Sequence, residues 1–163
     1  VAVCQKRELV LGDHLQGGYL LVDGVQDPGN IGTMIRTADA AGLSTVILGR
    51  GCADPYNGKV LRATQGSLFH LPVVEGDLFE WMAILKKEQI RVFGTALEGG
   101  EAYPSVSRGD PFALVVGNET SGVDPELLDR ADANLYIPIY GDAESLNVSV
   151  AAGILMYHLA AEE

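Results

Sequence analysis

A chain of 163 residues, of which 47% are hydrophobic and 20 are glycines, is long enough to fold as one domain around a single core. Its apolar runs are far shorter than the roughly 20 residues of a membrane-spanning helix, and its beginning does not resemble a signal peptide, which excludes a membrane or secreted protein. The net charge of −11 argues against nucleic-acid binding, because proteins that bind RNA or DNA usually present a basic face.

The cysteines and the first residue bear on location and domain organisation. Cys4 and Cys52 have no metal-ligand or disulfide spacing, so the sequence predicts no metal site, no disulfide and a reducing, cytoplasmic location. Residues 1–163 contain no linker or repeat and are expected to form one domain. Because the chain begins with Val rather than Met, we expect a further domain ahead of it.

Short β-rich runs alternate with helical stretches along the chain. Strands are expected at residues 18–24, 44–49, 91–97, 111–117 and 133–139. Helices are expected at about residues 30–41, 58–65, 77–88, 124–130 and 147–160. Continuous apolar strands that alternate with helices are typical of an α/β domain, in which helices cover both faces of a parallel sheet.

The first predicted helix has an unusual polar side. At about 100° per residue, one arc of about 120° holds the apolar residues Ile31, Met34, Ile35, Ala38 and Ala41. Gly32 and Arg36 lie together on the opposite side, one turn apart. Because helical side chains lean toward the N-terminus, we predict that Arg36 extends across the gap left by Gly32 toward Asn30 and the free amides of the first turn.

This arrangement predicts an anion site. The free N–H groups and the dipole of a helix N-terminus attract anions, and Arg36 and Asn30 would add a guanidinium and an amide. The site would suit a phosphate or an oxygen that gains negative charge. The alternative is that Arg36 pairs with Asp39 and Asn30 caps the helix, and the helix alone does not decide between the two.

Two later loops follow predicted strands. The stretch ALVVGNETSGV (113–123) runs into Gly117, and IPIYGDAESLNVSVAAG (137–153) leads to Ser145 and Asn147 at the start of the last helix. Glycine-rich loops at strand ends are where open α/β sheets bind ligands, although turns also need glycine. Ser145 or Asn147 alone would be an ordinary helix cap.

Together the three stretches resemble the signature motifs of the SpoU (TrmH) family of RNA 2′-O-ribose methyltransferases, in the SPOUT superfamily. The resemblance extends from about residue 20 to 160, and the dinucleotide-binding G-x-G-x-x-G is absent after the first strand. The matching motifs are Asn30-x-Gly32-x-x-x-Arg36, Gly117-Asn118-Glu119-x-x-Gly122 and Ser145-Leu146-Asn147-Val148-Ser149-Val150-Ala151.

The resemblance implies a fold and an assembly. Members of this family have a C-terminal deep trefoil knot, bind S-adenosylmethionine in the knotted loops and work as homodimers. The last helix, 147–160, is apolar on nearly every side and must be buried all round. We expect it in the knot and the dimer interface; the alternative is burial within one monomer.

The resemblance also implies catalytic residues. Arg36 would be the central one, either as the general base or, because a guanidinium with a pKa above about 12 hardly ever loses its proton, as a stabiliser of the 2′-oxygen or a clamp on the neighbouring phosphate. Asn30 and Glu119 would orient Arg36 and the ribose, and Ser145 and Asn147 would shape the pocket. The structural alternatives are helix caps for Asn30 and Ser145 and loop hydrogen bonds for Glu119 and Asn147.

Cofactor and RNA contacts follow from the same resemblance. RNA phosphates would be met by Arg36, Arg50, Lys59 and Arg62, although solvated surface charge is the alternative for each. The residues that match the cofactor-binding positions are Thr95, Ala96, Leu97, Gly117, Ile137 and Leu146. Ile137 and Leu146 could equally be core residues.

The acidic composition and the RNA substrate can be reconciled. Residues 30–75 carry four basic against three acidic side chains, so the net negative charge lies elsewhere, and a separate N-terminal RNA-recognition domain is expected to add affinity. The resemblance favours ribosomal RNA of the large subunit over transfer RNA. Two other functions stay open: a non-catalytic knotted dimer that binds RNA or the ribosome, and a Rossmann-like enzyme for a phosphorylated metabolite.

Overall fold

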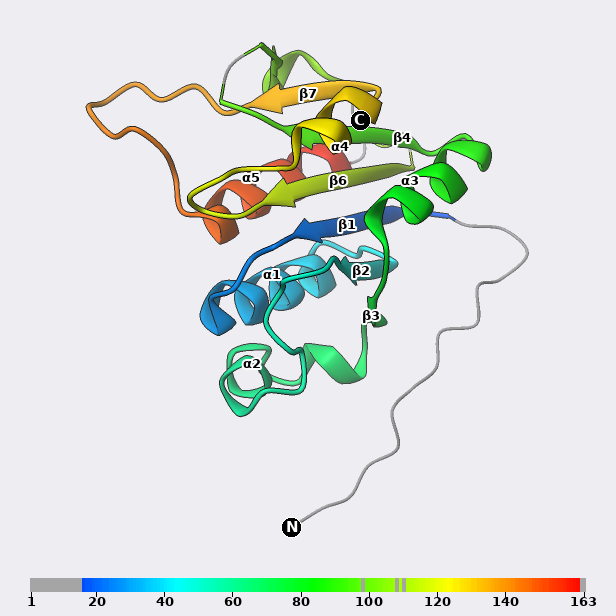
Figure 1. The fold of residues 1–163 in the computed structure, drawn as a ribbon, viewed down its shortest axis with the longest axis vertical. Coiled ribbons are helices and arrows are strands. Elements are labelled where there is room, and N and C mark those ends of the chain that lie inside the picture. Colours follow the sequence, from blue (N-terminus) through cyan, green and yellow to red (C-terminus); the bar gives the residue numbers. More distant parts are fainter. Residues whose placement is uncertain (1–15, 98, 108, 110, 162–163) are drawn as a thin grey trace.

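The computed structural model describes residues 16–97, 99–107, 109 and 111–161. Within them, seven parallel strands form one sheet in the order β3-β2-β1-β6-β4-β7-β5 (Figure 1). The strands are β1 (Gly18–Asp23), β2 (Thr45–Leu48), β3 (Val73–Glu75), β4 (Arg91–Thr95), β5 (Glu101–Ala102), β6 (Phe112–Gly117) and β7 (Ala133–Tyr136). The helices are α1 (Pro28–Ala40), α2 (Gly58–Ala63), α3 (Leu78–Lys87), α4 (Pro125–Arg130) and α5 (Val148–Ala160), with 3-10 turns η1 (Ser67–Phe69) and η2 (Tyr103–Ser105).

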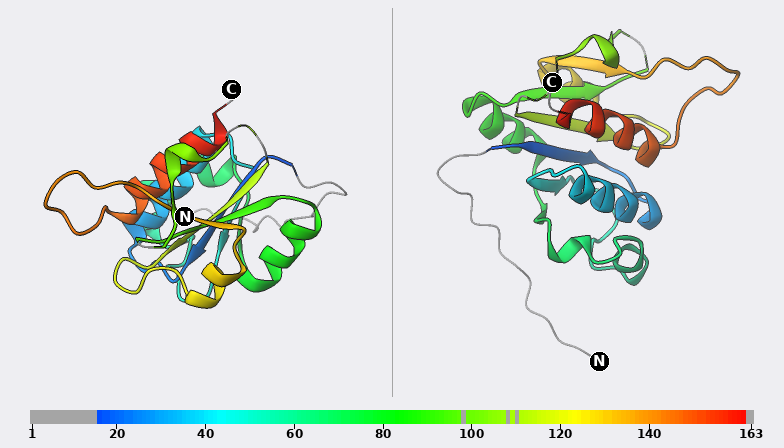
Figure 2. Two further views of the ribbon diagram at one scale, coloured as in Figure 1. Left: turned by 90° about the horizontal axis from the view of Figure 1, so that it is seen from above. Right: turned by 180° about the vertical axis from the view of Figure 1, so that it is seen from behind.

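Helices cover both faces of the sheet, as predicted (Figure 2). Alternate residues of a strand point to opposite faces, so Leu20 and Val22 of β1 join α1 and α5 in one core cluster, whereas Tyr19 and Leu21 join α3 and α4 in the other. The buried strands therefore read as continuous apolar runs, which is why the sequence predicted an α/β domain with a parallel sheet.

The predicted elements match the observed ones with two kinds of difference. The edge strands β3 and β5 were not predicted, because three and two residues are too few for a periodic pattern. The predicted strands also continue too far at their carboxyl ends, since β4 ends at Thr95 and β7 at Tyr136. The residues after these two strands leave the sheet and form loops.

Gly32 is buried, and the predicted path for Arg36 across it is wrong. Helix α2 packs against α1 at this position: a Cβ on Gly32 would overlap the Ala63 methyl group and lie 3.0 Å from the Val60 carbonyl oxygen. The glycine thus permits the close approach of two helices. The predicted apolar face is confirmed, because Ile31, Met34, Ile35 and Ala38 are buried in α1.

Helix α5 is only partly buried within one chain. It packs against α1 and β6, but Val150 and Tyr157 on its other side are 51% and 54% exposed. The alternative that the whole helix is buried inside one monomer is therefore wrong. In the described segments of the chain, no helix combines the length and apolar character needed to cross a membrane.

We expect Gly32→Ala to lower the free energy of unfolding by about 1–3 kcal/mol, because the added methyl group overpacks the contact between α1 and α2. Urea denaturation measures this change. Gly153→Ala is the matched control: it also lies within a helix, but its Cβ would meet only a Thr37 methyl group at 3.5 Å. Equal stability of the two variants would rule out the tight contact.

Candidate functional site

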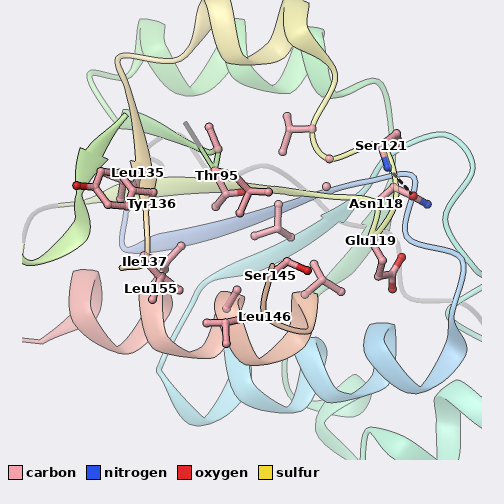
Figure 3. Close-up of a pocket in the computed structure, with 18 of the residues that line it drawn as sticks. Thr95, Asn118, Glu119, Ser121, Leu135, Tyr136, Ile137, Ser145, Leu146 and Leu155 are labelled. Carbon is pink, nitrogen blue, oxygen red and sulfur yellow. Dashed lines mark hydrogen bonds between the residues drawn. The ribbon is translucent and has the colours of Figure 1, made fainter. Parts of the chain in front are cut away.

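A cavity of about 520 Å³ opens at the carboxyl ends of β4, β6 and β7 (Figure 3). It is walled by the loops that follow these strands and by the start of α5, and this edge of an open parallel sheet is where ligands usually bind. All six predicted cofactor residues line it, together with two predicted catalytic residues: Thr95, Ala96, Leu97, Gly117, Ile137, Leu146, Glu119 and Ser145.

The loop after β6 lines the cavity with backbone peptide groups. At Gly117 a Cβ would overlap the backbone of Gly122 and Val123, so the loop can fold back only if residue 117 is glycine. Asn118 holds the loop in place: its side-chain amide donates to the Gly24 carbonyl (2.9 Å), and its Oδ1 accepts from the Thr120 N–H (2.8 Å). This stretch therefore presents peptide groups to a ligand.

The cavity combines apolar walls with polar groups and two carboxylates. Leu97, Ile137 and Leu146 form parts of its wall, and the charged side chains among its described lining residues are the carboxylates of Glu119 and Glu144. Apolar walls with backbone donors and acceptors suit a flat heterocycle, and carboxylates in the lining favour a ligand that carries positive charge. Within the described residues, no cluster of His, Cys, Asp and Glu is arranged to hold a metal ion.

A hydrogen-bonded cluster beside the cavity joins the three sequence motifs. The Asn30 side chain donates to Glu119 Oε1 (2.6 Å) and accepts from Asn147 Nδ2 (3.0 Å). Ser149 donates to Asn147 Oδ1 (2.6 Å) and lies 3.4 Å from Asn30 Oδ1. Asn30, Glu119 and Asn147 were each predicted as site residues, whereas Ser149 was missed, although it stands in the third motif two residues after Asn147.

The cap of α1 differs from the predicted alternative, whereas the cap of α5 is one of the two residues considered for it. Asp27 caps α1 by accepting from the Asn30 N–H (2.8 Å), so Asn30 is not the cap. Asn147 caps α5 by accepting from the Ser149 N–H (2.9 Å), so Ser145 is not the cap either. The Asn30 and Ser145 side chains are thus left for other roles, while Asn147 both caps α5 and binds Asn30.

Arg36 lies outside this cluster within one chain. It stands six residues after Asn30, which places it about 120° around α1 and about 9 Å further along its axis. Its side chain is exposed, and in the part of the chain that the structure describes it has no hydrogen bond or ion pair. The predicted contact of Arg36 with Asn30 is wrong. The alternative pair of Arg36 with Asp39 is also wrong, because Asp39 Oδ2 lies 3.4 Å from His70 Nδ1 instead.

The other basic residues predicted to meet RNA are exposed on the β1–β2 side of the sheet. Lys59 and Arg62 lie on α2, and Arg50 follows β2, where it lines a second cavity of about 560 Å³. Nearby, Cys52 donates to the Val22 carbonyl (3.2 Å), and burial raises the pKa of its thiol, which disfavours a nucleophilic role. Cys4 lies outside the described residues.

Comparisons with known proteins agree with the three motifs. The model of the SpoU rRNA Methylase family matches residues 18–157. The chain is 60% identical over 158 residues to the 23S rRNA (guanosine(2553)-2′-O)-methyltransferase RlmP of Bacillus subtilis (strain 168), and this match covers 97% of the chain but 63% of that relative's length.

Solved structures give the same result. The AdoMet-bound rRNA methyltransferase of Sinorhizobium meliloti is similar with a TM-score of 0.81 and 37% identity, over 90% of this chain and 57% of that one. The TrmH/SpoU tRNA modifying enzyme of A. aeolicus is similar with a TM-score of 0.79 and 29% identity, over 90% of this chain and 75% of that one.

We expect Asn30→Asp to destabilise the fold by about 1 kcal/mol near neutral pH, because a carboxylate replaces the amide that donates to Glu119. Repulsion raises the pKa of the carboxyl pair above its unfolded value, so the penalty is present near neutral pH and fades as the pH falls toward about 5. Urea denaturation at both pH values measures it.

Asn57→Asp is the matched control for this substitution. Asn57 caps α2 through Oδ1, which accepts from the Lys59 N–H (2.9 Å), and an aspartate caps a helix equally well. A pH-independent effect of Asn30→Asp, equal to that of Asn57→Asp, would contradict the assigned hydrogen bond.

Proposed function

Because this chain belongs to the SpoU rRNA Methylase family, we propose that it transfers a methyl group from S-adenosylmethionine to a ribose 2′-hydroxyl of ribosomal RNA. One observation carries the proposal: residues of the second and third motifs line a single cavity at the carboxyl end of the sheet, and Asn30 of the first motif is hydrogen-bonded to both motifs beside it. The chain spans less than two thirds of the RlmP relative, so activity, substrate and partners are all proposed for the chain.

The cavity fits S-adenosylmethionine in size, polarity and charge. Its volume of about 520 Å³ lies within the usual range for small-molecule sites. Peptide groups at Thr95–Leu97 and Gly117 would bind the adenine edge, and Ile137 and Leu146 would cover its faces. The bound cofactor supplies an electrophilic methyl group on a cationic sulfonium, which matches the carboxylates of Glu119 and Glu144.

The polar cluster would place the ribose against the methyl group. Methyl transfer needs an in-line approach of the 2′-oxygen, and correct positioning supplies on the order of 7–11 kcal/mol in favourable cases. Asn30 holds the Glu119 carboxylate in place, and Asn147 fixes Asn30 in turn. We assign Asn30 and Glu119 to orienting the ribose, and Ser145 and Asn147 to shaping the wall of the site.

Arg36 is proposed as the residue that handles negative charge on the RNA. Arg36 lies about 9 Å along α1 from Asn30, which we assign to the ribose. This distance favours contact of Arg36 with a phosphate next to the methylated ribose over contact with the 2′-oxygen bound at the Asn30 of its own protein chain. A guanidinium binds phosphate in a planar, two-pronged geometry and retains its proton at any working pH. A clamp on the phosphate is therefore easier than general-base catalysis.

Ribosomal RNA of the large subunit is the favoured substrate. The 23S rRNA methyltransferase of Bacillus subtilis shares 60% of its residues with this chain over the match, whereas the tRNA-modifying enzyme of A. aeolicus shares 29%. Transfer RNA is the second candidate. With such a substrate, we propose a cytoplasmic location. A separate RNA-recognition domain that offsets the net charge of −11 stays a prediction.

Helix α5 supports a homodimer. Its exposed side carries Val150 and Tyr157 next to half-buried Ile154, an apolar surface that a second copy would cover. We propose this face as the dimer interface. The C-terminal trefoil knot is proposed on the family resemblance, and it would involve the loop between β7 and α5 that projects from the body in Figure 1.

We expect Arg36→Lys to keep S-adenosylmethionine binding and to lower kcat about 100-fold, because lysine keeps the charge but loses the two-pronged geometry. Calorimetry and methyl transfer to ribosomal RNA from cells that lack the gene measure the two quantities. Arg91→Lys is the control, since Arg91 begins β4 at the opposite end of the sheet from the cavity. Near-normal turnover of Arg36→Lys would exclude the assigned role.

We expect Gly117→Ala to lose S-adenosylmethionine binding, because its methyl group would force the backbone of Gly122 and Val123 away from the cavity. Calorimetry checks this, with circular dichroism to confirm that the variant is folded. Gly58→Ala, whose Cβ would meet only the end of Arg62 at 3.5 Å, should bind normally. Retained binding by Gly117→Ala would place the cofactor elsewhere.

We expect Tyr157→Glu to convert a dimer into monomers, since a charge replaces an apolar contact in the proposed interface. Sedimentation analysis measures the molecular mass. Ile84→Glu on α3 introduces the same charge at another exposed apolar residue and should leave the assembly unchanged. A dimer that survives Tyr157→Glu and dissociates with Ile84→Glu would move the interface to α3.

A further inference from the structure

Phe69 is an exposed aromatic residue that the proposed reaction does not use. It ends the 3-10 turn η1 with 73% of its surface exposed, while its neighbour Leu68 packs on the core. Two consecutive residues with positive φ, Gln65 (51°) and Gly66 (97°), turn the chain sharply just before η1. The turn thus directs the Phe69 ring into solvent.

Helix α1, which packs against η1, carries Arg36 on the side that faces α2 and η1. Gly32, Arg36 and Asp39 lie on one face of α1, within about 60° of one another. Gly32 packs against α2, and Asp39 lies 3.4 Å from the ring of His70, the residue after Phe69. Arg36 therefore lies on the same face of α1, between the position that contacts α2 and the position next to His70.

Helix α2 adds more positive charge to this area. Lys59 and Arg62 are exposed on α2. Arg62 stands three residues before the turn at Gln65–Gly66. Both α2 and η1 pack against α1, so the turn that carries Phe69 and the helices that carry the cations are neighbours. We call Arg36, Arg62 and Phe69 the basic aromatic surface.

We propose that Phe69 stacks on an unpaired base of the RNA substrate while Arg36 and Arg62 contact the phosphates on either side of that base. The proposal rests on the proposed function and adds a requirement for a single-stranded nucleotide near the methylated ribose. Exposed aromatic rings beside cations are the usual platform for unpaired bases, because every base offers a π-face and a phosphate.

Charge favours RNA over a second copy of the chain at this surface. In a two-fold contact at this surface, Arg36 and Arg62 would face the same cations of the second copy and repel them, whereas these cations attract a polyanion. The apolar face suited to a second copy lies instead on α5, where Val150 and Tyr157 have apolar neighbours. Phe69 is followed by the exposed His70, and η1 packs against the helix that carries Arg36, which is a poor match for an apolar interface.

The test compares two RNA probes and three variants of the full-length protein. One probe is a hairpin with an unpaired loop, and the other is its stem extended into a continuous duplex. We expect Phe69→Ala to weaken hairpin binding about tenfold and to leave duplex binding unchanged, because stacking needs an unstacked base. Phe69→Trp should restore the affinity, since its ring stacks at least as well.

The matched control is Ile84→Ala, which shortens an exposed apolar side chain on α3 and should change neither probe's affinity. The proposal is overturned if Phe69→Ala lowers the affinity for hairpin and duplex equally, or lowers neither. It is also overturned if Phe69→Ala lowers the molecular mass of the protein, which would show that a second copy covers Phe69. Failure of the proposed function is distinguishable, because it would show as absent S-adenosylmethionine binding in the unaltered protein.

Discussion

The side-chain amide of Asn30 is the contact on which the arrangement of the site depends. An amide offers a donor and an acceptor from one planar group, and Asn30 uses both, toward Glu119 in the loop after β6 and toward Asn147 at the start of α5. These partners are 89 and 117 residues away in the sequence. One side chain thereby sets the positions of three segments, two of which wall the cavity.

Asn147 extends this control to the last helix. Its Oδ1 caps α5 while its Nδ2 donates to Asn30, so the end of the projecting loop, the start of α5 and the first turn of α1 are mutually fixed. The backbone conformation of the loop after β6 is set separately, by Asn118 and by the absence of a side chain at Gly117. Polar contacts and close backbone packing thus both contribute to the shape of the cavity.

The molecule separates its charges in a way that suits a small cation and a large anion. Two carboxylates line the cavity, and arginines and a lysine stand on α1 and α2, on the other half of the sheet. A chain with a net charge of −11 can therefore still offer a local surface to RNA, because solvent screens charges that lie more than about 10 Å apart. Composition alone averages over this separation, which is why it argued against RNA.

The sequence by itself determined the α/β class, the order of the main elements and, through its motifs, eight of the residues that line the cavity. Buried parallel strands need continuous apolar runs, and the loops at their carboxyl ends meet at one edge of the sheet whatever the details of packing. Tertiary structure decided which residues each helix face contacts. Gly32 contacts α2 rather than the Arg36 side chain, and Arg36 stands apart from Asn30. Asp27 caps α1, and Asn147 caps α5. Helical spacing shows which residues share a face, but only packing between distant segments determines what covers that face.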